Sequence, residues 1–190
     1  VRIPVTDGLE LGGFYFDGRR NGKCAVVLSH GHTGTRWGGL KYAPLFWKRG
    51  CDILSIDARY HGDSTGDFGT YGYFEKYDME QVVVWLRDKT DLPVDRIGLM
   101  GVSMGGAISL QAAALIPELA FVASDAAYAD LTQILSERGG RIYGPIVHVI
   151  TPLAYLLADL RGGMRIAEVS PKHSAREIQA PVFLSHSLTD

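Results

Sequence analysis

Short apolar runs punctuate this chain at intervals that suit the strands of a single sheet. A continuous apolar run occupies 24–28, and mainly apolar runs occupy 53–56 and 120–124. Another begins at Ile97, and a last one follows Pro181. Each is short and lacks polar alternation, which is typical of parallel strands that are covered on both faces. We therefore predict a buried, mostly parallel sheet.

The segments between these runs have the period of helices. Apolar residues recur at helical spacing over 37–49, 74–89 and 107–116, and Gly50 and Pro117 are stop signals for the first and last of these. Strands that alternate with helices in this order predict an α/β fold. The expected form is a doubly wound sheet with helices on both faces.

The N-terminal part departs from this alternation. Residues 1–5 and 9–16 are extended stretches joined across Asp7-Gly8, a pair that favours a tight hairpin turn. The two stretches are therefore expected to form an antiparallel edge of the sheet.

The alternation of predicted strands and helices also stops over 126–180. This stretch contains a helical pattern at 131–135 and an apolar run over 143–160 that is interrupted by Pro145 and Pro152. So many apolar residues are more than a single solvated helix face needs, which favours a helical lid inserted over the active site. The alternative is a plain pair of connecting helices on the sheet.

Composition narrows the class of protein. The 190 residues are 46% hydrophobic with a formal net charge of −2, which suits one globular domain over 1–190. No basic cluster predicts nucleic-acid binding, and no apolar run is long enough to span a bilayer. No histidine or cysteine spacing matches a metal site, and no cofactor is implied.

Two cysteines, Cys24 and Cys51, open two of the predicted strands. A bridge is geometrically feasible if the strands are neighbours, but two reduced core thiols are the favoured interpretation. No signal-peptide pattern is visible, and we expect a cytoplasmic protein. Because the chain starts at Val1 inside a strand-like pattern, an N-terminal piece is expected to have been removed or left unrecorded.

The stretch Gly101-Val102-Ser103-Met104-Gly105 carries the candidate chemistry. It links the apolar run that begins at Ile97 to an Ala-rich helical pattern, so Ser103 lies at the apex of a strand-to-helix turn. Side chains at Gly101 or Gly105 are expected to collide with the neighbouring strand or helix. The first helical amides have no partner within the helix and favour negative charge, so Ser103 is the candidate nucleophile. The alternative is an ordinary turn that happens to contain serine.

These features together resemble the α/β-hydrolase family, especially its bacterial esterase and serine-peptidase-like branches. The matching motifs are Gly101-x-Ser103-x-Gly105, His30-Gly31-His32, Asp57-x-Arg59-x-x-Gly62-x-Ser64 and the final apolar run, which leads to Asp190. Tyr60 stands where these branches have glycine.

The resemblance implies roles for particular residues. The backbone amides of His32 and Met104 would form the oxyanion hole, and Asp190 would be the acid of the triad. Asp125, at the end of the preceding strand, is the alternative acid. Asp57 and Arg59 are expected to be a structural pair beside the serine turn.

The family's chain order is serine, acid, histidine, and no residue follows Asp190 in this sequence. None of the histidines fits the role of general base. They are His30, His32, His61, His148, His173 and His186. We therefore expect a fragment that lacks the last strand, the histidine loop and the final helix, and that is nearly inactive alone. The exposed sheet edge would favour a homodimer.

The expected function is that of a serine hydrolase acting on a small-molecule ester, thioester or amide through an acyl-enzyme on Ser103. Two alternatives remain at this point: a non-catalytic hydrolase-fold binding protein, and a peptidase rather than an esterase. Specificity is expected to depend on the lid and on side chains near Trp37, Tyr71, Tyr128 and Tyr155.

Overall fold

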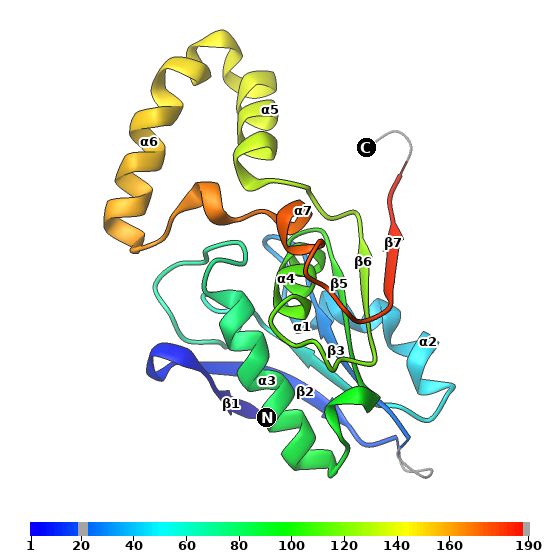
Figure 1. Ribbon diagram of the computed structural model, residues 1–190. Coiled ribbons are helices and arrows are strands. Elements are labelled where there is room, and N and C mark those ends of the chain that lie inside the picture. Colours follow the sequence, from blue (N-terminus) through cyan, green and yellow to red (C-terminus); the bar gives the residue numbers. More distant parts are fainter. Residues whose placement is uncertain (19–22, 188–190) are drawn as a thin grey trace.

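The computed structural model describes residues 1–18 and 23–187 (Figure 1). The strands are β1 (Arg2–Pro4), β2 (Glu10–Phe16), β3 (Ala25–Ser29), β4 (Asp52–Ile56), β5 (Ile97–Val102), β6 (Phe121–Asp125) and β7 (Val182–Ser185). The helices are α1 (Arg36–Gly39), α2 (Ala43–Trp47), α3 (Glu75–Thr90), α4 (Met104–Ala113), α5 (Leu131–Tyr143), α6 (Val147–Gly162) and α7 (Pro171–Ser174). Short 3₁₀ turns are η1 (Thr6–Gly8), η2 (Leu40–Tyr42), η3 (Val94–Arg96), η4 (Gly144–Ile146) and η5 (Ile166–Glu168).

The strands form one sheet in the order β1-β2-β4-β3-β5-β6-β7. β1 pairs antiparallel with β2, and β2 pairs antiparallel with β4, while the strands from β4 to β7 are parallel. Asp7 and Gly8 both have positive φ, as a tight turn between β1 and β2 requires. The predicted α/β fold, with an antiparallel N-terminal edge, is confirmed.

Side chains along the central strands alternate between two hydrophobic clusters. Leu54 and Leu99 belong to the cluster that includes apolar side chains of α3 and α4. Ile53 and Met100 belong to the other, against which Phe46 of α2 packs. Figure 1 shows these two helical layers on opposite sides of the sheet. Burial on both faces explains why the strands are continuous apolar runs.

Three helices differ from the sequence prediction in their extent. The segment 37–49 forms α1, η2 and α2 in succession, because Gly38-Gly39 and Pro44 weaken one continuous helix. α4 begins at Met104, directly after Ser103, rather than at 107. α6 forms one helix through Pro152, from Val147 to Gly162.

The interpretation of Cys24 and Cys51 as free thiols is wrong in this structure, where they form a disulfide. The parallel register of β3 and β4 sets Ala25 opposite Asp52, which places the preceding cysteines side by side with their Cα atoms 4.6 Å apart. Disulfides are typical of oxidising compartments. The cytoplasmic location stays a prediction.

The stretch 126–180 forms a helical hairpin of α5 and α6 followed by η5 and α7. Figure 1 shows α5 and α6 side by side, projecting from the rest of the molecule. A small cluster of Leu131, Met164, Ile166 and Val169 is buried at the base of this hairpin. β7 follows at the edge of the sheet with exposed apolar side chains. The homodimer through a sheet edge stays a prediction.

Candidate active site

The turn at Ser103 has the strained backbone of a strand-to-helix elbow. Ser103 has φ 51° and ψ −115°, between the end of β5 and the first residue of α4. Its N–H donates to the carbonyl oxygen of Asp125 at 2.7 Å, and its own carbonyl accepts the N–H of Ala107 at 3.0 Å. A non-glycine residue in such a region costs about 1–3 kcal/mol, so the surrounding structure must hold it there.

Three glycines let the backbone segments approach this closely. A Cβ at Gly101 would lie 2.2 Å from the carbonyl carbon of Gly105, at the start of α4. A Cβ at Gly105 would lie 2.5 Å from the carbonyl oxygens of Ser29 and His30, at the end of β3. A Cβ at Gly106 would lie 2.4 Å from Ser124 Oγ. The collisions predicted from the sequence at Gly101 and Gly105 are confirmed.

Ser103 lines a cavity of about 590 Å³ between the end of the sheet and α5. The residues that line this cavity are His32, Tyr71, Ser103, Met104, Ala126, Ala127, Tyr128, Ala129, Asp130, Leu131, Gln133, Ile134, Leu135, Glu137, Arg138, Arg141 and His186. The structure therefore brings Ser103, His32 and Met104, three residues singled out in the sequence, to one cavity. The loop after β3 passes beside the serine, since a Cβ at Gly31 would lie 3.5 Å from Ser103 Cβ.

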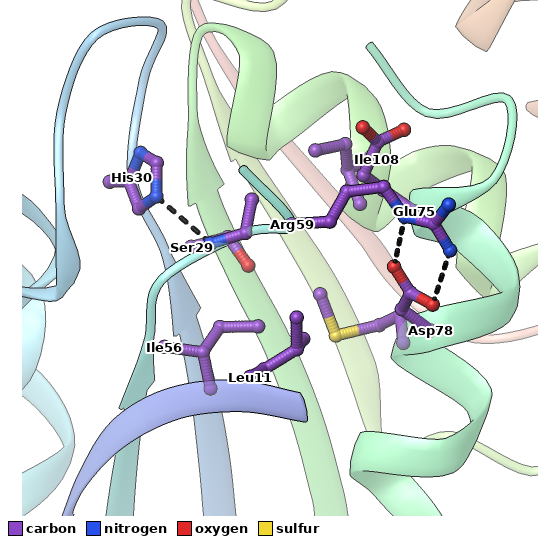
Figure 2. Close-up of a pocket in the computed structure, with 10 residues that line it drawn as sticks. Leu11, Ser29, His30, Ile56, Arg59, Glu75, Asp78 and Ile108 are labelled. Carbon is purple, nitrogen blue, oxygen red and sulfur yellow. Dashed lines mark hydrogen bonds and ion pairs between the residues drawn. The ribbon is translucent and has the colours of Figure 1, made fainter. Parts of the chain in front are cut away.

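His30 fixes the start of that loop from inside the protein. The N–H of Ala58 donates to His30 Nε2 at 3.0 Å (Figure 2). On the other side of the ring, Nδ1 lies 2.7 Å from the carbonyl oxygen of Gly31. Because Nε2 accepts, Nδ1 carries the proton and donates to Gly31. Burial lowers the pKa of His30, which favours this neutral ring. His30 therefore positions the loop that carries His32.

Asp57 ties the next loop to the start of α1. Its Oδ1 accepts the backbone N–H of Arg36 at 2.5 Å, its Oδ2 accepts the N–H of Asp63 at 3.0 Å, and the Arg36 guanidinium lies 3.3 Å away. At Gly62, which has φ +53°, a Cβ would lie 2.3 Å from the carboxylate, so only glycine fits. Tyr60, in place of the usual glycine, also has a left-handed backbone, with φ 65°.

Arg59 lies in the same loop but points the other way. Its Nε and Nη2 each donate to the carboxylate of Asp78 in α3 at 2.7 Å (Figure 2). Nη2 also donates to Thr6 Oγ1 at 2.9 Å. Asp57 and Arg59 are structural, as expected, but the prediction that they pair with each other is wrong. Each finds its partner on a different helix, Arg36 on α1 or Asp78 on α3.

The buried carboxylate of Glu75 orders the segment that carries Tyr71 into the cavity. It accepts the N–H of Thr70 at 2.6 Å, the hydroxyl of Thr70 at 2.5 Å and the N–H of Gly72 at 2.7 Å. Tyr128 donates its hydroxyl to the carbonyl oxygen of Tyr71 at 2.6 Å. Burial raises the pKa of both tyrosines, and the charge of Glu75 adds to the effect. Both phenols therefore stay protonated.

Of the two candidate acids, the structure describes Asp125 but not Asp190. Asp125 ends β6, and its carboxylate accepts the hydroxyl of Tyr42. Its side chain is not among those that line the cavity with Ser103 in the described part of the chain. Asp190 lies outside the described residues. His186, just after β7, does line the cavity, so the end of β7 leads toward it.

The sequence model of the X-Pro dipeptidyl-peptidase (S15) family matches residues 15–157. The chain belongs to this S15 family. The match contains the loop after β3, the turn at Ser103, all of α5 and most of α6.

Other proteins resemble this S15 chain over nearly all of its length. It is 33% identical to the uncharacterized protein YqkD of Bacillus subtilis over 190 residues, which cover 99% of this chain and 62% of that protein. An esterase of Pyrococcus furiosus, Pf2001, has 26% identity and a TM-score of 0.74, over 97% of this chain and 68% of that one. An α/β hydrolase of Penicillium, GrgF, has 23% identity and a TM-score of 0.64, over 86% and 55%. The fold is that of the α/β hydrolases.

The aromatic residues expected to affect specificity divide into two groups in this S15 chain. Tyr71 and Tyr128 line the cavity. Trp37 instead packs edge-on against Phe14 with ring centroids 4.6 Å apart, and Tyr155 donates to the carbonyl of Thr132 inside the hairpin. Of these four, only Tyr71 and Tyr128 line the same cavity as Ser103.

Several cavity residues were not singled out from the sequence for this role. Ile134, Arg138 and Arg141 of α5 line the cavity at helical spacing, and His186 joins them from the end of β7. The spacing of 134, 138 and 141 is a helix-face signal. The face of α5 that lies toward Ser103 depends on how the hairpin folds back over the sheet. The sequence pattern does not show this.

Within residues 1–18 and 23–187, no group of three histidine, cysteine, aspartate or glutamate side chains is placed to hold a metal ion. None of the helices in this part of the chain is long and apolar enough to cross a membrane.

Proposed function

We propose that this chain provides the nucleophile of a serine hydrolase that cleaves a carboxylic ester through an acyl-enzyme on Ser103. The observation that carries the proposal is the position of Ser103: a strained φ of 51° at the start of α4, facing a cavity of about 590 Å³. A serine held in a sparsely populated conformation at a cavity wall favours catalysis over an ordinary turn. Membership of the S15 family and the fold shared with an esterase support it.

In the proposed reaction Ser103 Oγ attacks the ester carbonyl carbon and loses its proton to a histidine. The backbone N–H groups of His32 and Met104 donate to the oxyanion that forms, and its collapse expels the alcohol, which takes the proton. Water then attacks the acyl group and releases the acid and Ser103. Asp190 orients the histidine in this proposal, with Asp125 as the alternative.

The base is assigned to none of the histidines of this chain. His30 uses both ring nitrogens inside the protein. Nδ1 of His61 lies 2.9 Å from the carbonyl of Arg59, and Nδ1 of His186 lies 3.0 Å from that of Ser187. The chain spans 62% of the length of YqkD, and the activity proposed here is that of the protein at its full natural length.

Labelling with a fluorophosphonate, together with turnover of p-nitrophenyl esters, tests the nucleophile at natural length. Ser103→Ala is expected to abolish labelling and to lower kcat/KM by roughly 10⁴-fold or more, because the attacking atom is gone. Ser109→Ala is the matched control: it removes another hydroxyl of α4, bonded to the Gly105 carbonyl at 2.8 Å. It is expected to keep the label.

A folded protein that takes no label at Ser103 would contradict the proposal and favour a binding function. Hydrolysis of peptides but not of simple esters would leave Ser103 in place and overturn the assignment to esters.

A further inference from the structure

The cavity beside the serine elbow changes character along α5. Leu131 and Ile134 line it at the start of the helix, and Glu137, Arg138 and Arg141 line it in the last two turns. Figure 1 shows α5 leading away from the sheet, so these last turns lie farthest from the elbow. Ligand cavities combine apolar walls with a few polar groups that fix the orientation of the ligand. The end of α5 is therefore a candidate for recognising a group remote from the elbow.

The two arginines at this end of the cavity differ from those that hold the loops. Arg36 and Arg59 each pair with a buried carboxylate, that of Asp57 or Asp78. Among the residues that the structure describes, neither Arg138 nor Arg141 has an ion-pair partner. A guanidinium presents five donors in a planar fork that matches a carboxylate. The donors of both arginines are therefore available to an anion in the cavity.

Two acids line the same cavity, but each makes another contact. The carboxylate of Asp130 accepts the hydroxyl of Ser170, and it lies directly before α5, where the unpaired amides of the first turn offset its charge. The carboxylate of Glu137 accepts the side-chain amide of Gln133 at 2.8 Å, one turn back toward the start of the helix. The positive charge of the cavity is thus concentrated at the end of α5.

We propose that Arg138 and Arg141 bind a carboxylate that the substrate carries in addition to its ester group. The inference rests on the proposed function of Ser103 and names the class of ester. Arg138 and Arg141 lie about 10 and 15 Å beyond Leu131 along the helix axis, so the carboxylate and the ester are joined by an extended apolar chain. Glu137 in the same turn disfavours a doubly charged phosphate, because it repels the second negative charge.

Binding to the chain itself tests the site without any measurement of hydrolysis. The two probes are monomethyl suberate, which has one carboxylate and one ester, and dimethyl suberate, which has the same chain without charge. Calorimetric titration is expected to show about tenfold tighter binding of the monomethyl ester. Because both arginines are exposed, added salt is expected to reduce this preference. Equal binding of the two probes would overturn the inference.

A pair of matched variants assigns the preference to the cavity. Arg141 and Arg161 are both exposed arginines in the last turn of a helix, but only Arg141 is among the residues that line the cavity. Arg141→Gln is expected to reduce the preference for the monomethyl ester about fivefold, and Arg141→Lys is expected to restore part of it. Arg161→Gln is expected to keep the preference. Circular dichroism checks that each variant is folded. Equal effects of the two glutamine variants would mean that general surface charge causes the preference, and would overturn the inference.

Turnover at natural length shows which part of the ester carries the carboxylate. p-Nitrophenyl hemisuberate is compared with p-nitrophenyl octanoate for a carboxylate on the acid part. The acetate ester of ω-hydroxyoctanoic acid is compared with octyl acetate for one on the alcohol part. The charged ester of one pair is expected to have a kcat/KM about tenfold higher than its neutral partner, mainly through a lower KM. Arg138→Gln is expected to reduce that ratio.

The outcomes separate this inference from the proposed function. Labelling of Ser103 by a fluorophosphonate without any preference for a charged ester would overturn the inference and leave the serine hydrolase in place. Binding of monomethyl suberate that depends on Arg141, without labelling of Ser103, would overturn the hydrolase and leave a cavity that binds carboxylates.

Discussion

The turn at Ser103 and the α5–α6 hairpin face each other across one cavity, but they are held in place by different means. At the turn, Gly101 and Gly105 bring backbone segments into direct contact, and every residue of α4 is buried. In the hairpin, only the base is buried, around Leu131 and Val169, and α6 exposes an apolar face. The contrast shows that close backbone packing fixes one wall of the cavity, whereas the other wall is buried only at the base of the hairpin.

The loop beside the elbow contains a buried ion pair, whereas the ion pair at the base of the hairpin is exposed. Breaking the buried pair is expected to give the largest change in the free energy of unfolding. Asp78→Ala leaves the buried Arg59 guanidinium with only the exposed Asp7 carboxylate at 3.4 Å and is expected to lower the free energy of unfolding by about 3–5 kcal/mol. Glu168→Ala breaks the exposed pair with Arg165 and is expected to cause no measurable change. Urea unfolding measures both. Equal losses would show that the two regions are held alike.

The buried strands and the elbow were predictable because each depends on neighbours in the sequence. Continuous apolar runs identify strands that are covered on both faces, and Gly101-x-Ser103-x-Gly105 encodes its own close packing. The mostly parallel pairing of the strands followed from their alternation with helices.

The polar contacts around the site were not predictable in the same way. Asp78 appears in the sequence as one more charge on a helix, and only the fold brings it to Arg59. The bond between Cys24 and Cys51 depends on the register of two strands. Likewise, the orientation of α5 that lines the cavity with Arg138 follows from the hairpin and not from local pattern.

Matched glycine substitutions test whether the elbow is more tightly packed than the hairpin. Gly101→Ala places a Cβ 2.2 Å from backbone atoms of α4 and is expected to cost about 3 kcal/mol or more. Gly163→Ala, at the end of α6, meets nothing within 4 Å, and its left-handed φ of 58° costs about 1 kcal/mol. Thermal and urea unfolding measure the difference. Similar losses at both positions would mean that steric packing does not distinguish the regions.

A smaller expected effect is a pH dependence of the free energy of unfolding, and it involves His30 in the loop beside the elbow. Burial lowers the pKa of His30 from 6.5, so the folded protein keeps this ring neutral while the unfolded chain takes up a proton below that pH. The unfolded state then binds more protons, and the free energy of unfolding decreases as the pH falls below 6.5. One proton gives a slope of at most about 1.4 kcal/mol per pH unit.

A protonated ring is also unable to accept the bond that the Ala58 N–H donates to His30 Nε2. His30→Gln is therefore expected to be less stable at neutral pH but to lose part of the dependence on acid, as urea unfolding at several pH values would measure. NMR titration of the His30 ring in the unmodified protein tests the same point without a substitution. A ring that titrates at 6.5 or above would show that His30 does not stabilise the loop beside Ser103 in its neutral form. The elbow would then lose one of the buried contacts that distinguish it from the hairpin.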